Sequence, residues 1–227
     1  MNSLPVLSKA KAEWLIPAGL LALSFIPIAA GTFRVVQLGV GGAITPDNAR
    51  FFAEPLPVVL HLLSAVIYCV LGAFQFSPSL RRRKPSWHRA AGRILVPCGL
   101  VAALSALWMT QFLTPAIEPP ASFDGPVVYV IRRLAGSAMA LSLCLGLAAV
   151  LRRDIPSHRA WMMRGYALGL GAGTQVLTHL PWYLFSGIRG ELARAVFMGA
   201  GWLINLAVAE WLILRERRRR FPGKPAP

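Results

Sequence analysis

The sequence predicts an all-α, polytopic integral membrane protein with six transmembrane helices. Three observations support this prediction: the composition, the length of the apolar segments, and the side of those segments on which the basic residues lie. Of the 227 residues, 56% are hydrophobic and 15% are charged, and the mean hydropathy is +0.55. Because ordinary soluble domains carry about 25% charged residues, the composition argues against a soluble domain. It also excludes a disordered chain.

Six apolar segments are long enough to cross a bilayer. About 20 apolar residues are needed, because a helix rises ~1.5 Å per residue and the hydrocarbon core is ~30 Å thick. The segments run over about 14–36, 55–77, 91–113, 127–150, 160–186 and 193–214. Their apolar runs do not alternate with the period of two that a barrel strand shows. We therefore expect a single membrane domain over residues 1–227, with a basic tail at 215–227.

The first segment is expected to be a retained helix, because it is too long for the core of a signal peptide. Sequences rich in helix breakers separate the segments that follow. Residues 37–54 contain glycine, asparagine and aspartate and predict a loop, and residues 114–126 are rich in proline and predict another. Residues 187–191 predict a tight turn between the fifth and sixth helices.

The charges are distributed unevenly between the two sides of the predicted helices. The side that holds both termini carries 18 of the 24 basic residues and 4 acidic ones, a net +14, whereas the other side carries 6 basic and 5 acidic residues, a net +1. The positive-inside rule then predicts a bacterial inner-membrane protein with both termini and the loops 78–90 and 151–159 in the cytoplasm. The net charge of +15 is thus mainly a signal of topology. We expect membrane lipids as partners, with anionic headgroups at the cytoplasmic face, and no nucleic acid.

The two basic loops resemble each other. Residues 82–90 read RRKPSWHRA and residues 152–160 read RRDIPSHRA, so Pro, Ser, His, Arg and Ala recur in the same order. The two histidines, His88 and His158, lie 70 residues apart, which is about the length of two helical hairpins. We therefore expect helices two and three to repeat as helices four and five, as parallel repeats do in some transporters. These helices two to five would form a four-helix bundle, flanked by helices one and six.

Four histidines form two pairs at matched depths. His61 and His179 are each expected ~10–12 Å inside the membrane from the side opposite the cytoplasm, whereas His88 and His158 lie at the cytoplasmic entrance of helices three and five. Two imidazoles at one depth on different helices provide the ligand pair of a haem iron inside a bundle. The leading hypothesis is therefore a haem b protein that transfers electrons, with His61 and His179 on one iron and His88 and His158 on another.

A polar cluster is expected in the cytoplasmic half of the bundle. Glu210 lies about one turn inside the basic end of helix six, where Arg164 and Arg159 are among its expected partners. The cluster comprises Gln75, Arg89, Arg93, Arg159, Arg164, Asn205 and Glu210. It predicts either an ion pair that fixes helix six to the bundle, or a site for an anionic headgroup, a haem propionate or a quinone.

Two alternatives to the haem hypothesis stay open. One is a cofactor-free membrane protein that handles a lipid or a small solute at the polar cluster together with His88 and His158. The other is an assembly or scaffold subunit of a larger membrane complex with an unknown protein partner. The sequence contains no HExxH, GxSxG or P-loop motif, so it gives no signature of a metalloprotease, a serine hydrolase or a P-loop nucleotidase.

Four motifs carry a resemblance to a known family. They are GAFQF at 72–76, HRAAGRI at 88–94, HRAWMMR at 158–164 and NLAVAEW at 205–211. With these motifs the chain resembles, over about residues 55–215, a family of predicted bacterial membrane proteins that is catalogued as a domain of unknown function. The resemblance implies a multi-helix inner-membrane protein without an assigned activity. The histidines also resemble those of dihaem transmembrane cytochromes b, although those proteins spread the ligands over four helices and here helix five would supply two.

Overall fold

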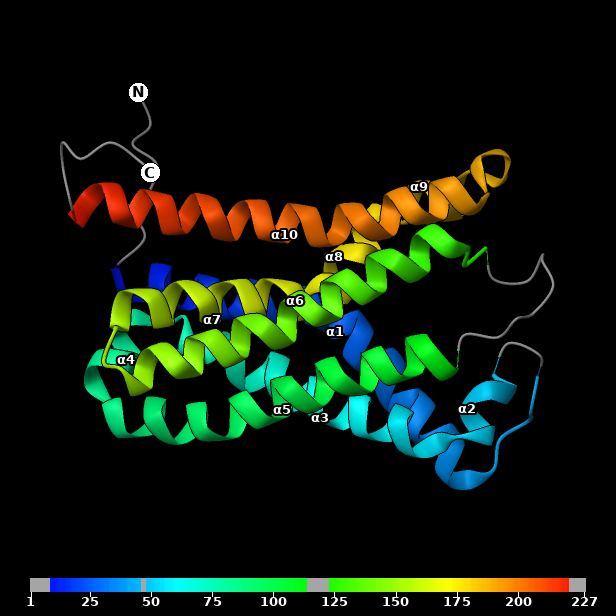
Figure 1. Ribbon diagram of the computed structural model, residues 1–227, viewed down its shortest axis with the longest axis horizontal. Helices are drawn as coiled ribbons and strands as arrows, with labels where there is room; N and C mark the ends of the chain where they lie inside the picture. The colour runs from blue at the N-terminus through cyan, green and yellow to red at the C-terminus, as the bar shows by residue number, and fades with distance from the viewer. Residues whose placement is uncertain (1–8, 46–47, 114–122, 221–227) are drawn as a thin grey trace.

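The computed structural model describes residues 9–45, 48–113 and 123–220, and this part of the chain contains helices and no strand (Figure 1). Most of the predicted proline-rich segment 114–126 and the end of the basic tail, from residue 221, lie outside the described residues. The helices are α1 (Lys9–Val40), α2 (Ala49–Ala53), α3 (Pro55–Gln75), α4 (Pro78–Arg83), α5 (Pro85–Phe112), α6 (Pro126–Leu151), α7 (Ile155–Gly169), α8 (Gly171–Thr178), α9 (Leu180–Leu184), the 3₁₀ helix η1 (Ser186–Ile188) and α10 (Glu191–Arg220).

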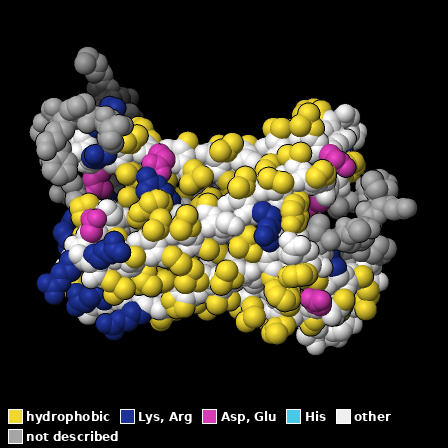
Figure 2. All heavy atoms as spheres, viewed as in Figure 1, with side chains coloured by type: hydrophobic (Ala, Val, Ile, Leu, Met, Phe, Trp, Pro, Cys, Tyr) yellow, Lys and Arg dark blue, Asp and Glu magenta, His cyan; other side chains and the backbone are white. Residues whose placement is uncertain are grey.

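Five of these helices are long and apolar enough to cross a membrane: α1, α3, α5, α6 and α10. They coincide with the first four predicted segments and the sixth, so five of the six predicted segments are confirmed as continuous helices. Large apolar side chains cover their outer surfaces, as the spread of hydrophobic atoms in Figure 2 shows. Phe25 on α1 is 69% exposed and Leu203 on α10 is 67% exposed. An apolar surface of this extent is unfavourable in water and is typical of a protein that faces lipid.

Proline positions explain where several helices begin. Pro55, Pro78, Pro85 and Pro126 are the first residues of α3, α4, α5 and α6. Proline suits this position because its fixed φ is helical and the first turn does not use the missing N–H. As a result, residues 78–90 are largely helical, formed by α4 and the first turns of α5. The prediction that they form a loop is wrong, because the proline at 85 starts a helix.

The fifth predicted segment, 160–186, is not one helix, and this prediction is also wrong. The structure divides the stretch into α7, α8 and α9, with interruptions at Leu170 and His179. Gly169 and Gly171 flank the first interruption, and glycine has a low helix propensity. Pro181 lacks the N–H that would continue the helix across the second. None of the three helices alone reaches the length of a membrane span.

Side chains of α10 complete the hydrogen bonding at the first interruption. The indole N–H of Trp202 donates to the carbonyl of Leu168 (3.1 Å), and the side-chain amide of Asn205 donates to the carbonyl of Ala167 (3.0 Å). Both carbonyls belong to the last turn of α7, where backbone acceptors lack intrahelical donors. Polar side chains also join α8 to α10. We call this polar region the α8–α10 seam; it is formed by Thr174, Gln175, Thr178, Trp202 and Asn205.

In the described part of the chain, α1, α3, α5, α6 and α10 run along the bundle, and α7, α8 and α9 follow one another as a further, interrupted run (Figure 1). At one end, Arg82 of α4 pairs with Glu13 of α1 at 3.2 Å, and Arg159 of α7 pairs with Glu216 of α10. We call this the basic end; it is formed by the start of α1, α4, the starts of α5 and α7, and the end of α10. Lys and Arg gather there in Figure 2.

An ion-pair network holds the opposite end of the bundle together. The carboxylate of Asp124, 5% exposed, lies 2.8 Å from the guanidinium of Arg132 on α6 and 3.1 Å from that of Arg194 on α10. It therefore joins the start of α6 to the start of α10, so α10 begins at this end and finishes at the basic end.

The core of the bundle draws on α3, α5, α6 and α7, with α1 and α10 packed outside them. Leu143 of α6 is fully buried, and the rings of Tyr68 and Tyr166 lie 5.6 Å apart beside it. A Cβ atom at Gly99 would lie 2.7 Å from Tyr68 and one at Gly72 2.3 Å from Tyr166. The two glycines are therefore what allows both rings to enter the core.

Candidate functional site

Two groups of polar side chains lie at the basic end. The first, which we call the histidine cluster, consists of Gln75, His88 and His158 at the ends of α3, α5 and α7. The second, which we call the basic pocket, lies between α7 and α10 and is lined by Arg159, Arg164, Arg217 and Glu216.

The two histidines occupy equivalent positions in the first turns of α5 and α7. His88 donates its backbone N–H to the carbonyl of Lys84 (3.2 Å), and His158 donates its own to the carbonyl of Asp154 (3.0 Å). The carboxylate of Asp154 also accepts the backbone N–H of Ser157 (3.1 Å), and the hydrogen bonds from Ser157 hold the pKa of Asp154 below its usual value. Each histidine is thus the fourth residue of its helix, which places both imidazoles at the same level along the bundle axis.

His88 and His158 both lie in the first turn of their helix at the basic end, and α5 and α7 contact each other. The Nδ1 atom of His158 lies 2.8 Å from the carbonyl oxygen of Gly146 on α6. A carbonyl only accepts hydrogen bonds, so this Nδ1 carries the proton and donates it, and Nε2 keeps its lone pair. The Nδ1 atom of His88 is buried and has no hydrogen-bond partner among the described residues.

Gln75 adds two further unpartnered atoms. Both the nitrogen and the oxygen of its side-chain amide are buried, and neither has a partner in the described part of the chain. Tyr68 of α3 packs at Gly99 of α5, and the two helices are antiparallel, so Gln75 is level with Gly92. Gly92 lies one turn from His88, or about 6 Å along the helix. The three unpartnered atoms therefore belong to one region of the bundle.

The Cβ position of Gly92, one turn after His88, is open. Gly92 follows His88 by four residues, which puts both on the same face of α5. A Cβ atom at Gly92 would meet no heavy atom within 4 Å, whereas one at Gly99, two turns further in, would lie 2.7 Å from Leu143. The tight packing of the core thus stops before the histidine cluster.

Basic residues flank His88 in the chain. Arg81 belongs to the last turn of α4, and Arg89 follows His88 directly on α5. No group of three or more His, Cys, Asp or Glu that would hold a bare metal ion occurs within the ranges that the structure describes.

His61 and His179, the other expected ligand pair, are engaged with different parts of the protein. The Nδ1 atom of His61 lies 2.8 Å from the carbonyl of Ala102 on α5, and that of His179 lies 2.7 Å from the carbonyl of Gln175 one turn before it. The ring of His179 packs on Phe197 of α10 at 5.9 Å. No hydrogen bond or ring contact found for the described residues joins the two histidines.

The predicted polar cluster divides into separate groups. Glu210 pairs with Arg164, whose Nη2 lies 2.9 Å from Oε2, and Arg159 pairs with Glu216. Arg89 and Arg93 are exposed on α5 and have no ion pair with Glu210. The two remaining members lie elsewhere: Asn205 belongs to the α8–α10 seam and Gln75 to the histidine cluster.

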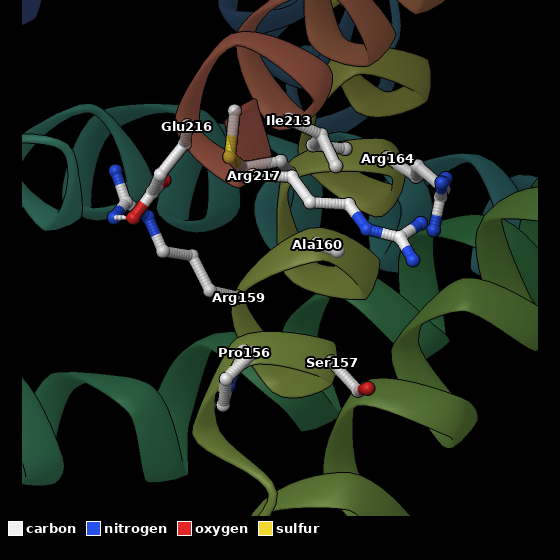
Figure 3. Close-up of a pocket in the computed structure, with 9 residues that line it drawn as sticks. Pro156, Ser157, Arg159, Ala160, Arg164, Ile213, Glu216 and Arg217 are labelled. Atoms are coloured by element: carbon white, nitrogen blue, oxygen red, sulfur yellow. Dashed lines mark hydrogen bonds and ion pairs between the residues drawn. The ribbon is translucent and has the colours of Figure 1, made fainter. Parts of the chain in front are cut away.

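The basic pocket has a volume of about 380 Å³ (Figure 3). Its polar wall is formed by three arginines and Glu216, and Met163 and Ile213 contribute to its apolar wall. The guanidinium of Arg164 lies 4.6 Å from the ring centroid of Trp161. Figure 3 shows Arg217 extending its guanidinium toward that of Arg164.

The sequence predicts that Glu216 and Arg217 belong to the basic tail, whereas the structure places both in the wall of the pocket. The signal that identifies them is spacing. Arg159 and Arg164 are five residues apart on α7, and Glu210 and Glu216 are six apart on α10. Because α7 and α10 are antiparallel, two arginines and two glutamates at nearly equal spacing can form two ion pairs. Arg217 is the residue after Glu216, so it lies next to one of these pairs.

Comparison with known proteins identifies the family. No curated protein and no solved structure matches the chain. The family model described as "Predicted membrane protein (DUF2306)" matches residues 58–213, which is more than half of the chain and includes both the histidine cluster and Glu210. The expected resemblance to a membrane protein family of unknown function is confirmed, and the chain belongs to this family of predicted membrane proteins.

Proposed function

We propose that the protein crosses the inner membrane of a bacterium six times, with its basic end in the cytoplasm. Five continuous helices and the interrupted run through α7, α8 and α9 support the number of crossings. The positive-inside rule supports the orientation, because the side that holds both termini carries a net +14 against +1 on the other. The fifth crossing would be discontinuous, which membrane proteins tolerate where neighbouring helices satisfy the freed backbone groups.

We propose further that the histidine cluster binds one haem b for electron transfer, in which His88 and His158 would hold the iron. The observation that carries this proposal is the equivalent placement of two histidines in the first turns of α5 and α7, two helices that contact each other, with open space at the Cβ position of Gly92. Haem b, when bound, supplies a one-electron carrier whose potential depends on its ligands and surroundings.

The residues of the cluster fit this group. The bond from Nδ1 of His158 to the Gly146 carbonyl fixes the tautomer and leaves Nε2 free, as ligating histidines usually do. Gly92 allows a flat macrocycle to lie close to α5. Arg81 in the last turn of α4 and Arg89 directly after His88 would supply positive charge for the two propionates. The proposal includes only one haem, because His61 and His179 contact separate helices.

Absorption spectroscopy of the full-length chain tests this proposal. The protein is expressed with ample haem supply and purified in detergent. We expect a Soret band and, after reduction, the sharp α band of a six-coordinate haem b. His88→Ala and His158→Ala should each abolish this spectrum, whereas His61→Ala, which removes a ring bonded to α5 outside the cluster, should retain it.

His158→Met separates ligand loss from misfolding. A thioether is a common axial ligand, so this variant should keep haem with a changed spectrum. Wild-type protein without a Soret band would contradict the proposal. So would a Soret band that survives in both His88→Ala and His158→Ala.

A further inference from the structure

The basic pocket is distinct from the histidine cluster, although both use α7. The imidazole of His158 is bonded to Gly146 on α6, whereas the pocket lies between α7 and α10. Its lining combines three guanidinium groups with apolar side chains. The proposed haem site does not account for this cavity, because the two lie on different sides of α7.

The pocket carries an excess of positive charge. Arg164 is paired with Glu210, and Arg159 with Glu216. Arg217 has no ion pair with any acidic residue that the structure describes, and its guanidinium extends toward Arg164 (Figure 3). Arg164 directs its Nε and Nη2 atoms to Glu210, so Nη1 is left to bind another acceptor. Two guanidinium groups therefore present unused donors to the same space.

The chemistry of these donors favours phosphate. Arginine presents planar, always charged N–H donors that match the geometry of phosphate oxygens. Ser157, which also lines the pocket, adds a hydroxyl group. A small anion alone would leave the apolar wall, including Met163 and Ile213, without a partner.

Tryptophans mark this level of the bundle as an interface between lipid and water. Trp161 stacks with Arg164, and Arg215 lies 5.2 Å from the ring centroid of Trp211, which is 56% exposed. Tryptophan is enriched at the depth of lipid headgroups. A lipid in the adjacent leaflet would thus have its phosphate at the height of the pocket and its glycerol and acyl chains against the apolar wall.

We propose that the basic pocket binds the phosphate group of an anionic phospholipid, with Arg217 and Arg164 as the principal donors. Glu216 limits the affinity, because it neutralises Arg159 at the rim of the same pocket. The site is independent of haem, because none of these residues belongs to the histidine cluster.

Lipid titration of the full-length chain tests the proposal. Protein in phosphatidylcholine nanodiscs is compared over rising fractions of phosphatidylglycerol, and bound lipid is counted by native mass spectrometry. Arg217→Gln should weaken phosphatidylglycerol binding about fivefold, as expected for one arginine near an anionic surface. Arg218→Gln is the matched control, since it removes an equal charge from the adjacent position, which does not line the pocket, and should change binding less than Arg217→Gln.

Glu216→Gln gives a test that misfolding cannot mimic. It releases Arg159 from its ion pair and should strengthen phosphatidylglycerol binding by a similar factor. Inorganic phosphate added at millimolar concentration should not compete. Equal effects of Arg217→Gln and Arg218→Gln, weaker binding by Glu216→Gln, or full competition by inorganic phosphate would each overturn the proposal of a lipid site.

Discussion

The α8–α10 seam and the histidine cluster are both polar regions inside an apolar bundle, but they differ in how their hydrogen bonds are used. In the seam, Thr174 donates to the amide oxygen of Asn205 (2.7 Å), and Thr178 donates to the carbonyl of Phe197 (2.6 Å). In the histidine cluster, the Nδ1 atom of His88 and both amide atoms of Gln75 have no partner among the described residues.

Two glutamines make the contrast specific. Gln175 donates its side-chain amide to the carbonyl of Met198 on α10 (3.1 Å), whereas Gln75 is buried without a partner. An unpartnered buried polar atom costs about 1–3 kcal/mol. The polar side chains of the seam therefore have partners within the protein. Trp202 and Asn205 bind the carbonyls that lack donors at the end of α7, and Gln175 and Thr178 bind carbonyls of α10. The unpartnered atoms of the histidine cluster have no such partner among the described residues, and the proposed haem site would account for them.

A large effect on stability is expected from Asn205→Leu. This change removes the partner of the Thr174 hydroxyl and of the Ala167 carbonyl at once. It should lower the free energy of unfolding by about 2 kcal/mol, a value between typical interhelical bonds in membranes and the cost of two unpaired groups. Thermal unfolding in detergent measures it. An unchanged midpoint would show that the seam does not hold α8 to α10.

A glycine pair tests the difference in packing. A Cβ atom at Gly171 would lie 2.0 Å from the indole nitrogen of Trp202, so Gly171→Ala should destabilise the protein by about 1–3 kcal/mol. Gly92→Ala enters open space in the middle of α5 and should stabilise the haem-free protein by up to ~1 kcal/mol. The two unfolding midpoints should therefore move in opposite directions, and a destabilising Gly92→Ala would contradict the open space at the Cβ position of Gly92.

The glutamine pair gives the smallest expected effects. Gln175→Leu should cost about 1 kcal/mol, because the carbonyl of Met198 loses its side-chain donor. Gln75→Leu should stabilise the haem-free protein by about the same amount, because it removes two buried atoms without partners. Midpoints measured on haem-free samples test both. Loss of stability in Gln75→Leu would show that this side chain is already bonded within the protein.

The sequence predicts most of the fold, because hydropathy, charge and proline carry the information. The prediction fails at α7–α9. The apolar run across Gly171 and Pro181 predicts one continuous helix, although the structure interrupts it at Leu170 and His179. The same interruption explains the error at Asn205. The sequence predicts this residue in the cluster at the basic end, but its side-chain amide donates to the carbonyl of Ala167 at the end of α7.

The site is predictable only in part. The equivalent motifs predict that His88 and His158 occupy the same place in their helices, and the structure puts them in the first turns of α5 and α7. Matched depth alone does not make His61 and His179 a pair, since it says nothing of the face on which each imidazole lies. Arg217 could not be predicted, because the composition of the basic tail does not indicate which of its arginines lies beside α7.

The haem content of the purified protein tests the central claim most directly. A pyridine haemochrome assay, normalised to protein mass, measures haem b per chain in the wild type and in Gly92→Leu, which keeps both histidines but fills the open space one turn after His88. We expect one haem b per chain in the wild type and none in a folded Gly92→Leu variant. Absence of haem b from the wild type, two haems per chain, or full haem content in Gly92→Leu would contradict it.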